Sequence, residues 1–210
     1  MKKLVLGAAI AMSSLTFAQQ FGLKAGMNVS SLSKDASMSD TKSKIGFNAG
    51  VFMNAPLAES FSIQPELLYS QMGNKSTITT SSTIGANTIT TKTTGSTDLD
   101  YVTLPVMFQY KATPNFYLEA GPEFGFLVNS KVKSDNEFTE AIGNEIYKKD
   151  NMNSFNFGLG LGAGYYFTPN IGITARYVAG FTDVTKENSD VTTNAKNRNN
   201  TFQAGLAFKF

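Results

Sequence analysis

Hydrophobic and polar positions alternate along much of the chain with a period of two, which is the pattern of β-strands whose two faces meet different environments. The alternation is clearest in four segments between Phe116 and Phe210. One parity of these segments has 25 positions without a charge or a glycine. On the other parity nine positions are Gly and four are charged, namely Glu119, Glu123, Arg176 and Lys209. A water-facing parity would be rich in charge, so we infer that the apolar parity faces lipid and the glycine-rich parity lines a narrow lumen.

Eight segments of the chain have the length of a tilted membrane-crossing strand, which takes about 9–11 residues. We expect them at Gln20–Asn28, Ile45–Met53, Phe61–Met72, Leu99–Lys111, Phe116–Val128, Ser154–Phe167, Ile171–Phe181 and Thr201–Phe210. Every backbone polar group inside lipid must be paired, so the sheet must close on itself. The predicted fold class is therefore all-β, an eight-stranded antiparallel up-and-down transmembrane β-barrel.

Short and long connections alternate between these segments, as is typical of outer-membrane barrels, which have short periplasmic turns and long extracellular loops. Two long connections have a distinctive composition. Gly73–Thr97 holds 14 Ser or Thr among 25 residues, and Asn129–Asn153 holds nine charged residues of mixed sign. We expect both to be solvated, mobile extracellular loops that bury no apolar area.

The first residues have the features of a secretory signal. Lys2 and Lys3 precede the apolar run Leu4–Met12, and Thr16-Phe17-Ala18 places small residues where a signal peptidase reads them. We expect residues 1–18 to be a removed signal peptide and residues 19–210 to form the barrel domain. The expected location is the outer membrane of a Gram-negative cell.

Composition excludes several classes of function. The chain has no Cys and no His, which removes disulfide scaffolds, thiolate zinc sites and Ser-His-Asp hydrolases. Without Lys2 and Lys3 it carries 16 basic and 16 acidic residues, so no basic excess points to nucleic acid. The run Gly158–Ala163 matches a dinucleotide-binding pattern, but the strand continues through Tyr165 and Tyr166 instead of giving way to a helix. We expect no enzyme activity, no cofactor and no metal.

Five charged residues have lumen-facing parity and lie close to the periplasmic ends of their strands. They are Lys24, Glu66, Glu119, Glu123 and Arg176. In a ring of eight, strands three and seven face each other, which puts Glu66 across from Arg176. Since buried charges must be paired, we hypothesise a plug of carboxylates bridged by Arg176 and Lys24. Two roles are open, a gate that passes small ions and a static plug, and the narrow interior of an eight-stranded barrel favours the plug.

Several blocks of the sequence resemble a known family. The blocks are Phe21–Ser30 (FGLKAGMNVS), Ile63–Gly73 (IQPELLYSQMG), Asp100–Leu127, Phe155–Val184 and the terminal FQAGLAFKF. They are similar to the porin-family outer-membrane β-barrel proteins, in particular the PorT-like group of small eight-stranded barrels. The resemblance implies an outer-membrane location and no catalytic residues. The final Phe210, with Leu206 and Phe208 on the same face, also resembles the C-terminal signal that the barrel-assembly machinery recognises.

The function expected from these features is that of a small, non-catalytic outer-membrane barrel with a plugged or narrow lumen and four long extracellular loops. Its expected partners are outer-membrane lipid and the barrel-assembly machinery. Three alternatives remain. They are adhesion or binding of an extracellular partner through the loops, an accessory role in protein secretion implied by the PorT-like resemblance, and a soluble lipocalin-like carrier with an apolar lumen.

Overall fold

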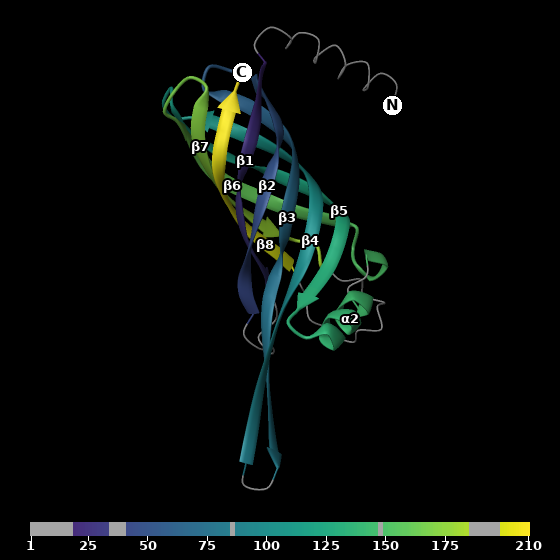
Figure 1. Cartoon of the computed structure of the whole chain (residues 1–210). Coiled ribbons are helices and arrows are strands. Elements are labelled where there is room, and N and C mark those ends of the chain that lie inside the picture. The colour runs from purple at the N-terminus through teal and green to yellow at the C-terminus, as the bar shows by residue number, and fades with distance from the viewer. Residues whose placement is uncertain (1–18, 34–40, 85–86, 147–148, 185–197) are drawn as a thin grey trace.

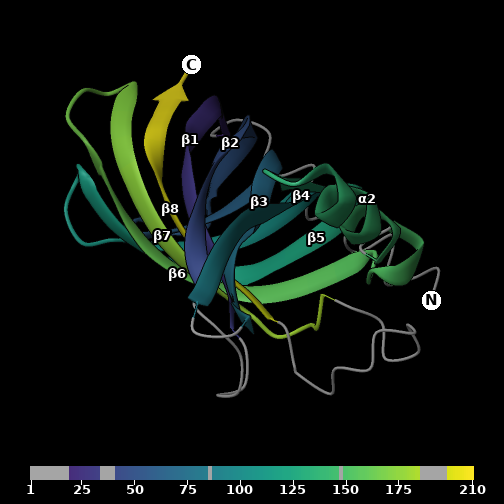
Figure 2. The same ribbon diagram turned by 60° about the horizontal axis from the view of Figure 1, so that its bottom comes forward.

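The computed structural model describes residues 19–33, 41–84, 87–146, 149–184 and 198–210. The strands in these ranges are β1 (Gln20–Ser33), β2 (Thr41–Pro56), β3 (Phe61–Ile84), β4 (Asn87–Lys111), β5 (Phe116–Ser134), β6 (Phe155–Tyr166), β7 (Ile171–Gly180) and β8 (Arg198–Lys209). Each strand pairs antiparallel with its neighbour in sequence, and β1 pairs with β8 to close the ring (Figures 1 and 2). The predicted eight-stranded barrel is confirmed. The expected signal peptide, residues 1–18, lies outside the described residues.

The short turns lie together at one end of the barrel, where the C-terminus also lies (Figure 1, top). Two of these turns repeat the sequence Thr-Pro-Asn, and their hydrogen bonds repeat as well. The hydroxyl of Thr113 accepts a bond of 3.0 Å from the backbone N–H of Phe116, and that of Thr168 accepts one of 2.9 Å from Ile171. The proline presets φ and the threonine closes the turn, which explains why this sequence joins strands tightly at both places.

The expectation of a loop at Gly73–Thr97 is wrong. The strands β3 and β4 continue through this segment and pair residue by residue up to Ile84 and Asn87. Pairing with the neighbouring strands reaches only Ser76 on β3 and Gly95 on β4, so the rest forms a two-stranded hairpin that projects from the barrel (Figure 1, bottom). Threonine favours strands, but the sequence of this hairpin does not alternate between apolar and polar residues, which is why the pattern did not reveal it.

The second expected loop, Asn129–Asn153, is also more ordered than predicted. It contains the last part of β5, the helix α2 (Glu137–Ile146) and the short 3₁₀ helix η1 (Lys149–Asn151). The side chain of Asn136 caps α2 by accepting a bond of 3.1 Å from the backbone N–H of Thr139. The helix was missed because ten residues give few turns of an amphipathic pattern. In the described ranges, no helix has the length and apolar character needed to cross a bilayer.

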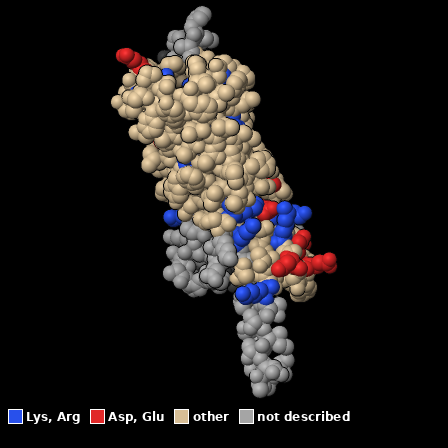
Figure 3. All heavy atoms as spheres, turned by 60° about the vertical axis from the view of Figure 1, so that its left-hand side comes forward, with Lys and Arg blue, Asp and Glu red and all other residues tan. Residues whose placement is uncertain are grey.

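The outer wall of the barrel is apolar. Most of the large side chains that point outward are more than a third exposed, from Phe21 on β1 to Phe208 on β8. Figure 3 shows a wall with few charged atoms between the short-turn end and the rim beside α2, where Lys, Arg, Asp and Glu gather. Aromatic rings pack against one another near both edges of this apolar belt, as in Phe126 with Phe155 at 5.7 Å and Phe208 with Phe210 at 5.6 Å between ring centroids. An exposed apolar belt of this kind is stable only against lipid.

Candidate functional site

The lumen charge cluster consists of the five residues that the sequence singled out. The structure places Lys24 on β1, Glu66 on β3, Glu119 and Glu123 on β5 and Arg176 on β7. All five are inside the barrel, and none is more than 5% exposed. Burial of this depth makes a hydrogen-bond or ionic partner necessary for each charge.

Arg176 is the centre of this cluster. Its guanidinium binds both oxygens of Glu66, with Nη2 2.7 Å from Oε1 and Nη1 3.0 Å from Oε2. Its Nε also lies 2.7 Å from Oε1 of Glu119. The fork of Arg176 therefore joins β7 to the opposite strand β3 and to β5, in the bidentate geometry that gives the strongest ionic hydrogen bonds.

Neighbouring side chains donate the remaining hydrogen bonds to the carboxylates of Glu66 and Glu119. Lys24 Nζ lies 3.1 Å from Glu66 Oε1, and Gln64 Nε2 donates to the same oxygen at 2.8 Å. Gln109 Nε2 donates to Glu119 Oε2 at 3.1 Å. Asn54 donates in turn to Gln64, to Gln109 and to Ser62. The result is a connected polar network across the lumen, in which partners stabilise one another.

Glu123 is inside the lumen but does not join this network. Its Oε2 is buried and has no hydrogen-bond partner. The hypothesis that Arg176 and Lys24 bridge the carboxylates thus describes Glu66 and Glu119 and leaves out Glu123.

Glycines on β6 make room for this network. A Cβ at Gly162 would lie 3.0 Å from Glu119 Oε1, and one at Gly160 would lie 3.4 Å from Arg176 Cδ. At Gly164 the added carbon would lie only 2.3 Å from the ring of Tyr117. The glycine run that resembles a dinucleotide motif is therefore the face of β6 against which lumen side chains lie.

A layer of three aromatic side chains and one alanine occupies the short-turn end of the lumen. It consists of Phe52, Tyr117, Tyr166 and Ala207. The rings of Tyr117 and Tyr166 lie 6.0 Å apart, and the ammonium of Lys209 lies 3.7 Å from the centroid of Tyr166. This layer covers the charged network on its short-turn side.

A second apolar layer lies at the long-loop end. Its members are Met72, Leu99, Tyr101, Leu127, Met152 and Val184, all at most 4% exposed. Met152 and Val184 belong to connecting segments, which Asn153 ties together by a backbone bond of 2.9 Å to the carbonyl of Val184. The sequence did not reveal these two residues, because irregular segments carry no periodic signal.

A salt-bridge cluster lies at the same end, beyond the apolar belt. Asp98 lies 2.9 Å from the ammonium groups of both Lys44 on β2 and Lys133 on β5. Partial burial raises the pKa of Asp98, but the hydrogen bonds and charges of the two lysines outweigh burial and hold this pKa below its usual value. The bridge joins β4 to its neighbour β5 and, across β3, to β2, at the base of the projecting hairpin.

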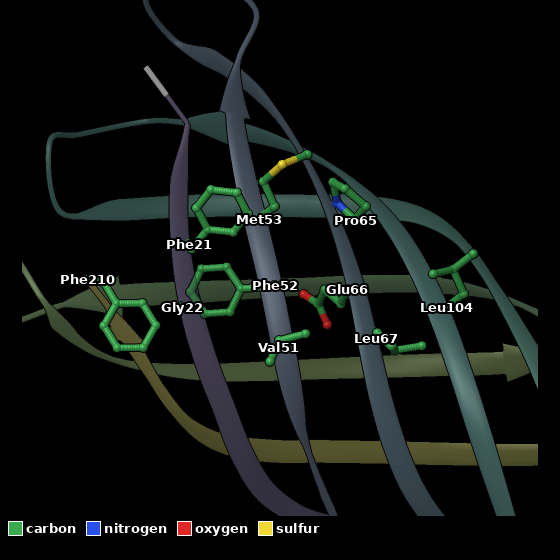
Figure 4. A pocket seen from close by; sticks show the side chains of 10 residues that line it. All are labelled: Phe21, Gly22, Val51, Phe52, Met53, Pro65, Glu66, Leu67, Leu104 and Phe210. Carbon is green, nitrogen blue, oxygen red and sulfur yellow. The ribbon is translucent and has the colours of Figure 1, made fainter. Parts of the chain in front are cut away.

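The C-terminal residues Leu206, Phe208 and Phe210 lie on the outer face of the barrel, 56%, 41% and 72% exposed. An apolar groove of about 450 Å³ lies nearby, lined mainly by outward-facing side chains such as Phe210, Phe21 and Met53, and also by Phe52 and Glu66 of the lumen (Figure 4). Because most of its lining is apolar and faces outward, this groove belongs to the lipid-facing surface.

Comparison with known proteins agrees with this architecture. Residues 17–186 match the family model of the outer membrane protein beta-barrel domain. The chain is similar to the crystal structure of Neisserial surface protein A, with 13% identity, a TM-score of 0.52 and coverage of 92% of this chain and 99% of that one. It is also similar to the Ail protein of Yersinia pestis, with 13% identity, a TM-score of 0.49 and coverage of 92% and 100%. No curated protein matches the sequence.

The family match establishes an outer-membrane location. Because outer-membrane barrels have short periplasmic turns and long extracellular loops, we infer that the hairpin and α2 lie outside the cell. The structure also removes one alternative. A soluble lipocalin-like carrier needs an apolar lumen and a polar exterior, whereas this barrel has charged side chains inside and an apolar wall outside.

Proposed function

Since this chain belongs to the family of the outer membrane protein beta-barrel domain, we propose that it is a non-catalytic barrel whose lumen is closed and whose work is done by its extracellular part. The observation that carries this proposal is the bridge from Arg176 to Glu66 and Glu119. Side chains from β3, β5 and β7 meet in one network, and apolar layers lie on both sides of it. An eight-stranded barrel has an interior only wide enough for such side chains.

The experiment compares ion conductance in planar bilayers for the native protein and for the double variant Arg176→Ala/Glu66→Ala. The variant removes one charge of each sign, so the net charge of the lumen stays the same while the bridge is lost. We expect a baseline current for the native protein and a steady leak for the variant. Equal, sizeable conductance of both proteins would contradict a closed lumen.

A second candidate, binding of an extracellular partner, is favoured by the hairpin of β3 and β4. Beyond Ser76 and Gly95 the hairpin pairs only with itself and projects away from the membrane. Such a projection contributes nothing to closure of the barrel, so a role in contact with another surface explains its presence better. The test is attachment of cells that carry either the native protein or a variant in which an Asn-Gly turn replaces residues 78–93. Unchanged attachment to host matrix and to neighbouring cells would remove this candidate.

An accessory role in protein secretion is a third candidate, and it rests on the PorT-like resemblance of blocks such as Ile63–Gly73. The test is a deletion strain complemented by the native gene or by the hairpin variant. A secretion defect that only the native gene restores supports the role. Normal secretion in the deletion strain would remove it.

Leu206, Phe208 and Phe210 are proposed as the signal read by the barrel-assembly machinery. Their exposure on β8, the strand that closes the ring against β1, supports this role because the side chains are free to bind a partner before the barrel closes. The test is the assembly rate of Phe210→Ala in cells, followed by the appearance of the heat-modifiable form. Phe202→Ala, on the same strand and face, is the matched control.

A further inference from the structure

Among the buried oxygen atoms that have no hydrogen-bond partner, three come from adjacent strands of the barrel. They are Oγ1 of Thr103 on β4, Oε2 of Glu123 on β5 and Oδ1 of Asn156 on β6. Buried polar atoms in native proteins are nearly always bonded to protein, water or an ion. Three such atoms in one region therefore indicate a ligand that supplies what the protein does not.

The strand register brings these residues around Gly125. This glycine pairs with Thr103 on one side and with Asn156 on the other, and Glu123 precedes it by two residues on the same face of β5. A Cβ at Gly125 would lie 3.4 Å from Asn156 Cβ and from Tyr101 Cδ1, and 3.6 Å from Thr103 Cγ2. These three side chains surround the glycine, and the missing side chain leaves a space the size of a methyl group among them.

The chemistry of the three groups selects a cation. A carboxylate and an amide oxygen accept hydrogen bonds and cannot donate, and a hydroxyl oxygen can coordinate an ion. Oxygen atoms of these types are the ligands that hard cations prefer. A fully buried carboxylate without a positive partner is strongly unfavourable, and Glu123 is only 4% exposed.

The balance of charges in the lumen favours a ligand with a single positive charge. The lumen charge cluster contains two basic side chains, Lys24 and Arg176, and three acidic ones. Arg176 and Lys24 are engaged by Glu66 and Glu119, which leaves the charge of Glu123 uncompensated. A monovalent cation balances this charge, whereas a divalent one would leave an excess.

We propose that Glu123, Thr103 and Asn156 bind a monovalent cation of the size of Na⁺, with water completing its coordination. The ion occupies the space beside Gly125 and completes the charge balance of the lumen. This site goes beyond closure of the barrel, because the bridge of Arg176 does not need it.

The experiment measures thermal unfolding of the full chain, refolded in a zwitterionic detergent, in NaCl and in N-methyl-D-glucamine chloride at equal ionic strength. The organic cation is too large for the site and controls for screening. If the dissociation constant is about 10 mM, about 100 mM Na⁺ raises the ratio of folded to unfolded protein about tenfold. We expect a saturable rise in the unfolding temperature with Na⁺.

Three variants sharpen this test. Glu123→Gln keeps the shape of the side chain and removes its charge, and we expect it to fold and to lose the Na⁺ dependence. Gly125→Ala fills the space with a methyl group at ordinary contact distances, and we expect weaker Na⁺ dependence with the charge intact. Thr174→Val changes another buried lumen threonine, on β7, and should respond to Na⁺ as the native protein does.

Two results would overturn the site. One is equal stability of the native protein in both salts. If acid stabilises the protein and Na⁺ does not, Glu123 holds a proton instead of an ion. The other is a Na⁺ effect that persists in Glu123→Gln, which would place the ion elsewhere.

Discussion

Arg176 and Glu66 stand on opposite strands of the ring, β7 and β3, and still meet in a two-point bond of 2.7 and 3.0 Å. A contact of this kind requires the two side chains to span the lumen between them. It requires small neighbours as well, which the glycines of β6 provide. The lumen of this barrel is thus organised around one guanidinium.

Loss of Arg176 should destabilise the barrel strongly. Arg176→Ala leaves the carboxylates of Glu66 and Glu119 without their main partner, and breaking a buried ion pair costs about 3–5 kcal/mol. The measurement is the temperature at which the heat-modifiable form disappears on a gel. Arg176→Lys keeps the charge but offers a single point of contact, and we expect an intermediate loss. Native-like stability of Arg176→Ala would mean that the network contributes little.

Gly164 should tolerate no side chain while Tyr117 stays in place. A Cβ there would lie 2.3 Å from the tyrosine ring, and overpacking of this kind costs about 1–3 kcal/mol. Gly164→Ala should therefore lower the unfolding temperature, and adding Tyr117→Leu should restore part of it. Gly160→Ala is the matched control on the same strand, because it would meet the flexible end of Met107 at 3.0 Å. Equal effects of the two alanines would contradict the stated contact.

Acid should loosen the base of the extracellular hairpin. Because the pKa of Asp98 is lower in the folded protein than in the unfolded chain, the bridge stabilises the fold above the usual Asp value. That contribution is lost as the pH falls below about 4 and passes through the lowered pKa. The protection factors of backbone amides near Gly73 and Gly95, which correct the exchange rate for its intrinsic pH dependence, measure the loss. In Asp98→Asn these protection factors should be low at neutral pH and should not fall further in acid. An acid response equal to that of the native protein would contradict this assignment.

Shortening the hairpin should leave the barrel intact. Residues 78–93 pair only within the hairpin, and Thr77 and Thr94 lie opposite each other. An Asn-Gly turn suits a two-residue connection at this point. We expect the shortened protein to show the same gel shift on boiling and the same unfolding temperature as the native protein. A large loss of stability would show that the hairpin takes part in closing the barrel.

The sequence was sufficient for the parts of the fold that lie in lipid, and insufficient outside it. In lipid each strand has an apolar face and a lumen face, so Phe155 to Phe167 alternate cleanly and Glu66 and Arg176 could be placed opposite each other. In the projecting part of the β3–β4 hairpin, which pairs only with itself, the sequence no longer alternates. The methyl-sized space beside Gly125 could not be predicted either, because it depends on which side chains surround a glycine across the neighbouring strands.

Conductance tests the closed lumen most directly. Single-channel recordings of the native protein and of Arg176→Ala/Glu66→Ala, both checked for the heat-modifiable form beforehand, compare a bridged lumen with an unbridged one of equal net charge. The closed lumen predicts no discrete openings from the native protein and a stable leak from the variant. Steady native channels with the same conductance as the variant would contradict it.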